Sequence, residues 1–339
     1  MKILNVGIAG YGVIGPRRRK YIDSHPNLRT IAVCDRSFDH DGCFPDGVKY
    51  FADYRDLLKE NLDVVFVCVT HDIAPEITIK SLQSNRHVFC EKPPGRNPCD
   101  VSAVIDEEYL HPDLKLKYGF NHRYHNSIID ALKIIKSGDL GDVINVRGLY
   151  GKATIAGRNN NWRSQRSLAG GGILLDQGIH MLDLMRLICG EFTSVKSFVT
   201  NSHWQHDVED NAFAIMKTDS GVVAMIHSTA TQWKHKFQLD ITLTRGSISL
   251  SGILTGTKSY GQETMTVIKS SPDDLGVPNE IVSTYINDNS WENEIKDFAA
   301  AILENKDVLT GNSKDALATM DLVYKIYRAD DDWASKYKI

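Results

Sequence analysis

The chain contains 339 residues, of which 42% are hydrophobic and 24% are charged, and its formal net charge is −4. These values are typical of a soluble globular protein, and the length exceeds what one hydrophobic core usually needs, so we expect two domains. The small negative charge gives no electrostatic case for nucleic acid or an anionic membrane as a partner.

No stretch approaches the ~20 continuous apolar residues of a membrane-spanning helix, and the N-terminus lacks the pattern of a secretory signal. The six cysteines form no CxxC pair and no zinc-ligand spacing, which suits reduced thiols in the cytoplasm. We therefore expect a cytoplasmic protein with no membrane partner and no bound metal.

The N-terminal segment carries a glycine motif between a strand and a helix. Residues 2–9 predict a buried strand, and a helix opens at Pro16; between them lie Gly10, Tyr11, Gly12, Val13, Ile14 and Gly15. The first glycine permits a tight turn, the second lets a pyrophosphate approach the backbone, and the third lets the helix pack on the strand. The helix N-terminus then attracts the phosphates. This segment predicts a dinucleotide-binding site.

A second predicted strand, residues 30–34, ends at Asp35, which is followed by Arg36. A carboxylate about twenty residues after such a motif accepts hydrogen bonds from the ribose hydroxyls of the cofactor. Asp35 would repel the 2′-phosphate of NADP, so we expect NAD to be preferred. Arg36 leaves NADP possible, because its guanidinium could recruit that phosphate or stack on adenine.

Strands and helices continue to alternate up to about residue 120. We expect strands over residues 63–70, 87–90 and 114–118, and helices over residues 53–58, 75–84 and 100–109. This order predicts an α/β domain with a parallel, doubly wound sheet, which binds ligands at the carboxyl ends of its strands. The further candidates at those ends are Thr70, His71, Glu91, Lys92, Asn121 and Arg123.

Three of these candidates have ordinary structural readings as well. Lys92 could be a surface lysine in a turn before a proline, although its place at a strand end beside the expected cofactor favours function. Asn121 and Arg123 could cap the helix that follows instead of contacting a ligand.

From about residue 123 the pattern changes. After a predicted helix over residues 126–137, short strands follow one another at residues 143–150, 195–200, 213–217, 222–228, 237–244 and 247–251. Successive strands with few helices between them predict a mainly antiparallel sheet in a C-terminal α+β domain. We therefore divide the chain into domains 1–122 and 123–339. Two last helices, residues 291–304 and 314–328, carry apolar packing stripes.

Three glycines at residues 170–172 precede a predicted helix over residues 175–188 that carries Asp176, His180 and Asp183. Asp176 and His180 are four positions apart, so they would share one face of the helix. They could be a hydrogen-bonded pair in the core, or an acid–base pair in which Asp176 orients His180. The polar loop before them, residues 159–166, is either a surface excursion or a cover over a ligand. As a cover it would let Trp162 stack on a sugar and Arg163 donate to substrate or cofactor.

Four motifs occur in the order typical of one family: the glycine motif, Glu91-Lys92-Pro93, Gly-Phe-Asn-x-Arg at residues 119–123, and GGGILLDQGIH at residues 170–180. Together they resemble the Gfo/Idh/MocA oxidoreductases over nearly the whole chain. The resemblance implies that Lys92, Asp176 and His180 line the substrate site. It also implies a large open sheet with helices on one face and the other face free to meet another subunit. The chain departs from the family pattern near the nicotinamide, where His71 follows Thr70 in place of proline.

The leading hypothesis is an NAD(P)-dependent dehydrogenase that acts on a secondary alcohol of a sugar, a sugar derivative or a cyclitol, as a homodimer or homotetramer. Lys92, Asp176 and His180 would be catalytic, and the last two would have to face the cofactor across a domain cleft. The alternative is a non-catalytic nucleotide-binding sensor of the same fold, which need not keep these three residues. A metal-dependent hydrolase would lack a third ligand beside Asp176 and His180, and it would leave the glycine motif unexplained.

Overall fold

The computed structural model describes residues 2–155, 161–270 and 279–339. The chain forms two compact units. Unit 1 comprises the residues up to Phe120 together with Trp291–Met320, and unit 2 comprises Asn121–Ser290 and Asp321–Ile339. The first boundary lies close to our division after residue 122. The segment Trp291–Met320, which we had assigned to the second domain, groups with the first.

Unit 1 contains a seven-stranded sheet in the order β3-β4-β2-β1-β5-β6-β7. Every pairing is parallel except that of β3 with β4 at one edge. The strands are β1 (Leu4–Ala9), β2 (Leu28–Cys34), β3 (Gly42–Cys43), β4 (Lys49–Phe51), β5 (Val64–Val67), β6 (His87–Cys90) and β7 (Leu116–Tyr118). The strand order reverses between β1 and β5, which is where a doubly wound sheet binds its ligand. The predicted parallel sheet is confirmed.

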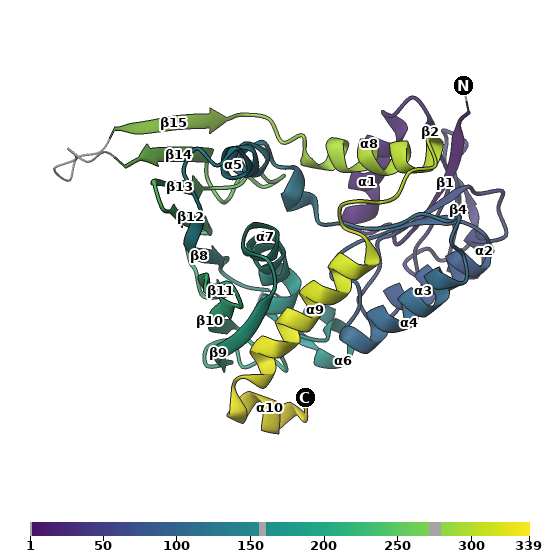
Figure 1. Cartoon of the computed structure of the whole chain (residues 1–339). Coiled ribbons are helices and arrows are strands. Elements are labelled where there is room, and N and C mark those ends of the chain that lie inside the picture. Colours follow the sequence, from purple (N-terminus) through teal and green to yellow (C-terminus); the bar gives the residue numbers. More distant parts are fainter. Residues whose placement is uncertain (1, 156–160, 271–278) are drawn as a thin grey trace. The chain divides into compact units, whose positions relative to one another are not determined.

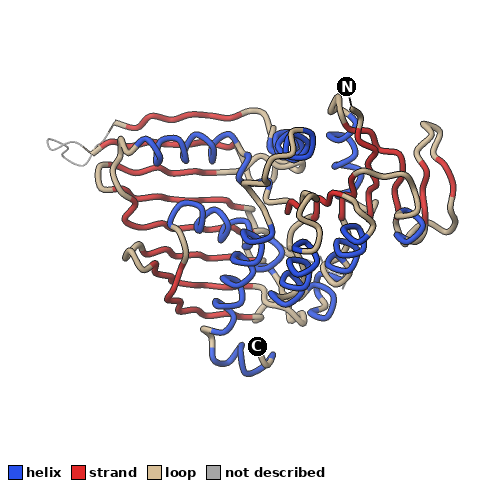
Figure 2. The backbone as a smooth tube through the Cα atoms, turned by 45° about the vertical axis from the view of Figure 1, so that its right-hand side comes forward, coloured by secondary structure: helices blue, strands red, loops and turns tan. Residues whose placement is uncertain are grey.

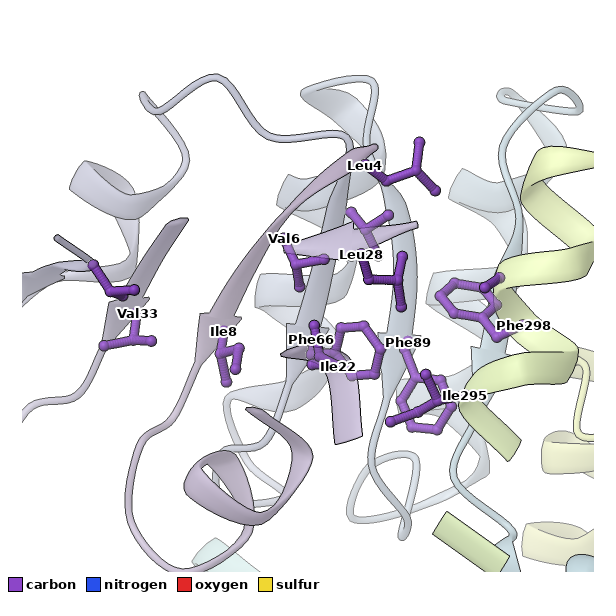
Figure 3. Close-up of a cluster of buried hydrophobic side chains, with 13 residues drawn as sticks. Leu4, Val6, Ile8, Ile22, Leu28, Val33, Phe66, Phe89, Ile295 and Phe298 are labelled. Atoms are coloured by element: carbon purple, nitrogen blue, oxygen red, sulfur yellow. The ribbon is translucent and has the colours of Figure 1, made fainter. Parts of the chain in front are cut away.

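Figure 3 shows the core of unit 1, in which side chains from β1 lie near aromatic rings of β5 and β6. Phe66 and Phe89 stack with their ring centroids 4.8 Å apart, and the ring of Phe298 meets Phe89 edge-on at 5.5 Å. Phe298 belongs to α8 (Ser290–Leu303) and is only 1% exposed. This packing explains why the segment after residue 290 groups with unit 1. The apolar stripe predicted that the helix packs, but it could not show against which domain.

The other helices of unit 1 are α1 (Ile14–Asp23), α2 (Tyr54–Leu57), α3 (Ala74–Gln83) and α4 (Pro98–Tyr109). Helix α9 (Ser313–Arg328) is shared, because the unit boundary falls after Met320. No helix in the described ranges is both long and apolar enough to cross a membrane. All six cysteines are free thiols.

Unit 2 is built on an eight-stranded sheet in the order β15-β14-β13-β12-β8-β11-β10-β9 (Figures 1 and 2). Among the described strands of this unit, only β8 and β11 pair in parallel, so the predicted, mainly antiparallel sheet is confirmed. The strands are β8 (Val143–Gly151), β9 (Phe192–Thr200), β10 (Asn211–Thr218), β11 (Val223–Thr229), β12 (Lys236–Leu243), β13 (Gly246–Ser251), β14 (Glu263–Lys269) and β15 (Glu280–Tyr285). The last two strands, and the short edge strands β3 and β4 of unit 1, were not predicted.

Helices α5 (Asn126–Ser137) and α7 (Ile179–Cys189) lie on the same side of this sheet (Figure 1). Along β10 the residues alternate: Ala212, Ala214 and Met216 are buried, whereas Phe213 and Ile215 are exposed. A period of two places the first set against the helices and the second set on the opposite face. Short elements complete the unit: α6 (Arg166–Ala169), α10 (Asp331–Tyr337), and 3-10 turns at Asn121–Tyr124 and Trp162–Ser164.

Candidate active site

The glycine motif of unit 1 has the geometry that a dinucleotide requires. Gly10 adopts φ +91°, and a Cβ atom there would lie 2.3 Å from the carbonyl oxygen of Cys68. A Cβ atom on Gly15 would lie 2.2 Å from the carbonyl oxygen of Gly10. At Gly12, by contrast, an added Cβ meets nothing within 4 Å. The first and third glycines are therefore needed for packing, and the open space at the second suits the approach of a pyrophosphate.

The residues after this loop leave a helix end available for an anion. Helix α1 begins at Ile14, and no side chain caps its N-terminus. The preceding residue, Val13, is 79% exposed although it is apolar. Uncapped N–H groups and the helix dipole favour a phosphate at this position. The residues present fit the phosphates of NAD.

Asp35 follows β2, as predicted, and organises the same loop. Its Oδ2 accepts a hydrogen bond from the N–H of Tyr11 at 2.7 Å, and its Oδ1 accepts from the N–H of Ser37 at 2.9 Å. Burial disfavours its charge, but the hydrogen bonds from Ser37 and Tyr11, with the nearby Arg36, lower the pKa of Asp35. The carboxylate is therefore ionised at neutral pH, as binding of ribose hydroxyls requires.

Glu91, a predicted cofactor ligand, takes part in a buried ion network. The Arg18 side chain is 0% exposed. Its Nε donates a hydrogen bond to Glu91 Oε1 at 2.5 Å, and its Nη2 forms an ion pair with Glu294 Oε2 at 2.7 Å. Its guanidinium also lies 4.4 Å from the centre of the Phe89 ring and 4.3 Å from that of Trp291. The Glu91 side chain therefore serves to hold the end of β6, directly before Lys92.

The remaining candidates of unit 1 lie at the strand ends. Lys92 is partly buried directly after β6, and its peptide bond to Pro93 is cis. The carbonyl oxygen of Thr70 accepts the N–H of Ala74 at the start of α3, and His71 is buried, at 4% exposed. The sheet thus brings these residues to the carboxyl ends of β5 and β6, as expected from the doubly wound topology.

In unit 2 the predicted helix begins with a π-helical turn, Leu174–Gly178, before α7. This differs from the continuous α-helix that we predicted over residues 175–188. A π turn is wider than an α turn, so Asp176 and His180 do not have the ordinary i,i+4 relation. Gly178 accounts for the close packing here, since a Cβ atom on it would lie 2.6 Å from Ser228 Oγ of β11.

The buried carboxylate of Glu209 holds the backbone at the start of this helix. Its Oε2 accepts the N–H of Gly172 at 2.7 Å, and its Oε1 accepts the N–H of Leu174 at 3.0 Å and the hydroxyl of Tyr327 at 2.7 Å. A Cβ atom on Gly172 would lie 2.1 Å from the Glu209 carbonyl oxygen. The glycine at residue 172 is thus required by this contact. Burial raises the pKa of Glu209.

Asp176 is bound by two cations that come from different segments. Lys152 Nζ, just after β8, lies 2.9 Å from Oδ2, and Arg163 Nε lies 3.2 Å from Oδ1. Arg163 also places its guanidinium 4.3 Å from the centre of the Trp162 ring. The predicted loop therefore brings Arg163 to Asp176; Asn159 and Asn160 of that loop lie outside the described residues. Lys152 was not predicted, because no motif marks a lysine at a strand end.

His180 stacks face to face on His122, with ring centroids 3.8 Å apart and an interplanar angle of 11°. His122 Nε2 lies 3.0 Å from the hydroxyl of Tyr150 on β8. The sequence placed His122 just past a strand end, at the variable position of the Gly-Phe-Asn-x-Arg motif, but gave neither His122 nor Tyr150 a role. The predicted neighbour Asn121 lies in the same cluster and donates through Nδ2 to Ser290 Oγ at 3.1 Å.

Arg123 was predicted to contact substrate or to cap a helix. Its Nη2 lies 2.6 Å from Asp183 Oδ1 and its Nε lies 2.7 Å from Asp183 Oδ2. Both side chains are buried, at 7% and 0% exposed for the residues. A bidentate pair of this kind is geometrically specific. It joins the turn at Asn121–Tyr124 to α7, so the contact that the structure gives Arg123 is an internal one.

Two sequence profiles match the chain. The oxidoreductase family with an NAD-binding Rossmann fold matches residues 4–111, and the GFO/IDH/MocA C-terminal domain matches residues 128–249. The chain belongs to the Gfo/Idh/MocA family. It is therefore an NAD-binding oxidoreductase, as the four motifs implied.

Similar proteins agree with this assignment. An inositol 2-dehydrogenase of Salmonella paratyphi B is 25% identical over 257 residues, which cover 73% of this chain and 74% of that protein. A myo-inositol 2-dehydrogenase of Thermotoga maritima is 25% identical over 284 residues, 80% of each chain. A solved structure of levoglucosan dehydrogenase in complex with NADH and L-sorbose matches with a TM-score of 0.86, 20% identity and 98% coverage of both chains. Because the identity is only 20%, this match shows that the two proteins share a fold and does not show a shared substrate.

Proposed function

We propose that this oxidoreductase transfers a hydride between NAD and a secondary alcohol of a sugar, a sugar derivative or a cyclitol. The observation that carries the proposal is the pairing of Asp176 with Lys152 and Arg163 on the turn that leads into His180. It offers an ionised acceptor for a sugar hydroxyl close in the chain to a histidine, the residue type most often used as a general base. The relatives named for inositol and levoglucosan support a polyhydroxylated ring as substrate.

Oxidation of the alcohol removes a hydride from carbon and a proton from oxygen. Bound NAD would supply the acceptor for this hydride, and bound NADH would supply the donor in the reverse direction. We assign the proton to His180, whose ring nitrogen takes it as the carbonyl forms and returns it on reduction. Lys92 would donate a hydrogen bond to the same oxygen and stabilise its developing negative charge.

Asp176 would accept a hydrogen bond from a neighbouring hydroxyl and so orient the ring. Its ion pairs with Lys152 and Arg163 hold this carboxylate in place. Trp162, beside Arg163, would offer an aromatic face to the apolar side of the sugar. The residues that would hold NAD are those of the glycine motif with Asp35, Thr70 and His71. Glu91 and Asn121, whose side chains contact Arg18 and Ser290, stay predicted cofactor ligands.

The test is a screen for NADH formation with purified protein. Myo-inositol, levoglucosan, a free aldose, a sugar phosphate and a nucleotide sugar are each supplied with NAD, and the reverse reaction is screened with NADH and the corresponding ketones. We expect turnover with at least one ring polyol, and its loss in the His180→Asn variant. A protein that binds NADH by fluorescence titration but turns over none of these compounds would instead be the non-catalytic sensor.

A further inference from the structure

His122 has no part in the mechanism above, yet it contacts the proposed base. The two rings are parallel within 11° at a centroid distance of 3.8 Å, and both residues are 5% exposed. His122 comes from the 3-10 turn at Asn121–Tyr124, whereas His180 comes from α7. Two imidazoles stacked this closely in a buried setting cannot both become cations without strong repulsion. Which of them takes a proton is therefore decided by their other contacts.

A directional set of hydrogen bonds fixes the Nδ1 side of His122. Ser290 Oγ donates its single hydrogen to Asp288 Oδ1 at 2.6 Å, so it can only accept from Asn121 Nδ2, which lies 3.1 Å away. The amide of Asn121 must then present its oxygen to His122 Nδ1, at 3.3 Å. An amide oxygen only accepts. His122 Nδ1 therefore carries a hydrogen.

The Nε2 side of His122 faces the hydroxyl of Tyr150 at 3.0 Å. Tyr150 is 4% exposed, and burial raises the pKa of its hydroxyl well above the ordinary value. The hydroxyl therefore keeps its proton. It also contacts the side chain of Tyr260, which in turn contacts Gln177. When the Tyr260 hydroxyl donates to Tyr150, the hydrogen of Tyr150 is left for Nε2. With Nδ1 donating and Nε2 accepting, His122 has the pattern of a neutral imidazole.

The other titratable groups on the elements packed here do not call for a positive charge on His122, because each carboxylate has a cation or hydrogen-bond donors of its own. Asp176 is bound by Lys152 and Arg163, and Asp183 is bound by Arg123. Glu263 contacts His125 Nδ1 at 2.9 Å and accepts from Ser127, and the ring of His125 meets His122 edge-on at 5.4 Å. Burial also raises the pKa of Tyr260, whose ring lies 5.3 Å from that of Tyr150.

We propose that His122 is a positioning residue for proton transfer: a neutral imidazole, fixed by Asn121 and Tyr150, on whose face the ring of His180 lies. It holds that ring in one plane and leaves His180 as the member of the pair that takes the proton. A neutral ring also does not repel the imidazolium that forms on His180 during oxidation, as a second cation would. The inference rests on the proposed function in one respect, that His180 is the base.

Nitrogen-15 NMR of histidine-labelled, full-length protein tests the protonation pattern without any substrate. The His122 and His180 signals are assigned by their loss in the His122→Phe and His180→Asn variants. We expect His122 to stay in the neutral form with hydrogen on Nδ1 between about pH 5.5 and pH 8, the range in which an unperturbed histidine titrates. A His122 ring that gains a proton in this range, or that carries its hydrogen on Nε2, would overturn the proposal whether or not the protein is a dehydrogenase.

Steady-state kinetics test the positioning role, with myo-inositol or levoglucosan, whichever is turned over. His122→Phe keeps a flat ring and His122→Leu removes it, and both lose the same hydrogen bonds. We expect the first to keep kcat within about threefold and the second to lose about tenfold or more, with the KM for NAD unchanged in both. His203→Leu, at an exposed histidine of the same unit, is the control. Equal losses in the Phe and Leu variants, or no loss in either, would show that the face of His122 does not position His180.

Discussion

His180 and Lys92 have the largest predicted effects on catalysis. Replacing His180 with Ala removes the proposed base, and general acid–base catalysis contributes roughly 10²–10⁴-fold, so kcat should fall by about that factor. Lys92→Ala should lose at least as much, because it also removes the charge that stabilises the reacting oxygen. The measurement is kcat at saturating NAD with a substrate found in the screen.

The control for these variants is Gly12→Val. The space beside Gly12 is open, so the variant should fold without a steric clash. Its valine side chain would occupy the space that the pyrophosphate needs. It should therefore weaken NAD binding much more than His180→Ala does. Near-normal kcat in His180→Ala would remove the role assigned to this histidine.

Asp35 predicts the choice of cofactor. Its ionised carboxylate would accept hydrogen bonds from the ribose hydroxyls and repel a 2′-phosphate, so kcat/KM should be higher with NAD than with NADP. Asp35→Ser should narrow the difference, leaving the exposed Arg36 to attract the phosphate. The comparison is made at equal concentrations of the two cofactors. Equal or better turnover with NADP in the unaltered protein would contradict the prediction.

The raised pKa of Glu294 leads us to expect that the stability of the protein depends on pH. Burial raises its pKa from 4.5 to about 7, although Arg18 opposes the shift. A carboxyl group that holds its proton more tightly in the folded state adds stability below pH 4.5, and that contribution is lost as the pH rises through about 7. The loss is at most about 3 kcal/mol. Glu294→Gln removes this loss, because an amide stays neutral.

The urea midpoint is measured for Glu294→Gln and for the unaltered protein at each pH. We expect the midpoint of the variant minus that of the unaltered protein to increase as the pH rises from about 5 to about 8. Glu292→Gln is the control, because this residue of α8 is 43% exposed in its side chain and pairs with Lys296 at the surface. Carboxyl groups with lowered pKa values, such as Glu263, act at lower pH. A midpoint difference that does not change with pH would show that Glu294 is ionised throughout.

Among the elements, the turn before α7 depends on one buried carboxylate. Glu209→Ala would leave the N–H groups of Gly172 and Leu174 without their acceptor, at about 1–3 kcal/mol for each buried group. We expect a lower melting temperature and, because the turn carries Asp176 and leads to His180, a lower kcat. Asp207→Ala is the control, since this nearby carboxylate is exposed. Melting temperatures by calorimetry that fall equally in both variants would contradict a special role for Glu209.

Local sequence patterns predicted most of these elements, because period and turn residues are local signals. The strand at His87–Cys90 and the helix at Asn126–Ser137 have the predicted bounds. The π turn at Leu174–Gly178 was not predicted. The close approach of Gly178 to Ser228, a residue of β11, is also not visible in the local sequence. Contacts between distant segments were likewise missed: Lys152 with Asp176, His122 with His180, and Arg123 with Asp183. The residue types were visible, but their pairing is a tertiary property.

At the scale of the whole molecule, one exposed face of the unit 2 sheet is the candidate interface of the expected oligomer. Its face opposite α5 and α7 carries large apolar side chains in register across neighbouring strands. Phe198 on β9 pairs with Phe213 on β10, which pairs with His227 on β11. Two residues further along β10, Ile215 pairs with Met225 of β11. Phe198, Phe213, Ile215 and Met225 are 75%, 44%, 54% and 46% exposed. A contiguous apolar patch of this kind usually marks an interface.

We expect this face to join two or more copies of the chain, since homo-oligomers commonly bury the same surface patch on each subunit. Ile215→Lys places a charge at the centre of the patch without altering the buried side of β10. It should shift the mass measured by light scattering at micromolar concentration from a multiple of the chain mass toward 38.0 kDa. Tyr109→Lys is the control, because that residue belongs to unit 1 and is 84% exposed. A mass of 38.0 kDa for the unaltered protein would refute the expectation. An Ile215→Lys variant that stayed oligomeric would place the interface elsewhere.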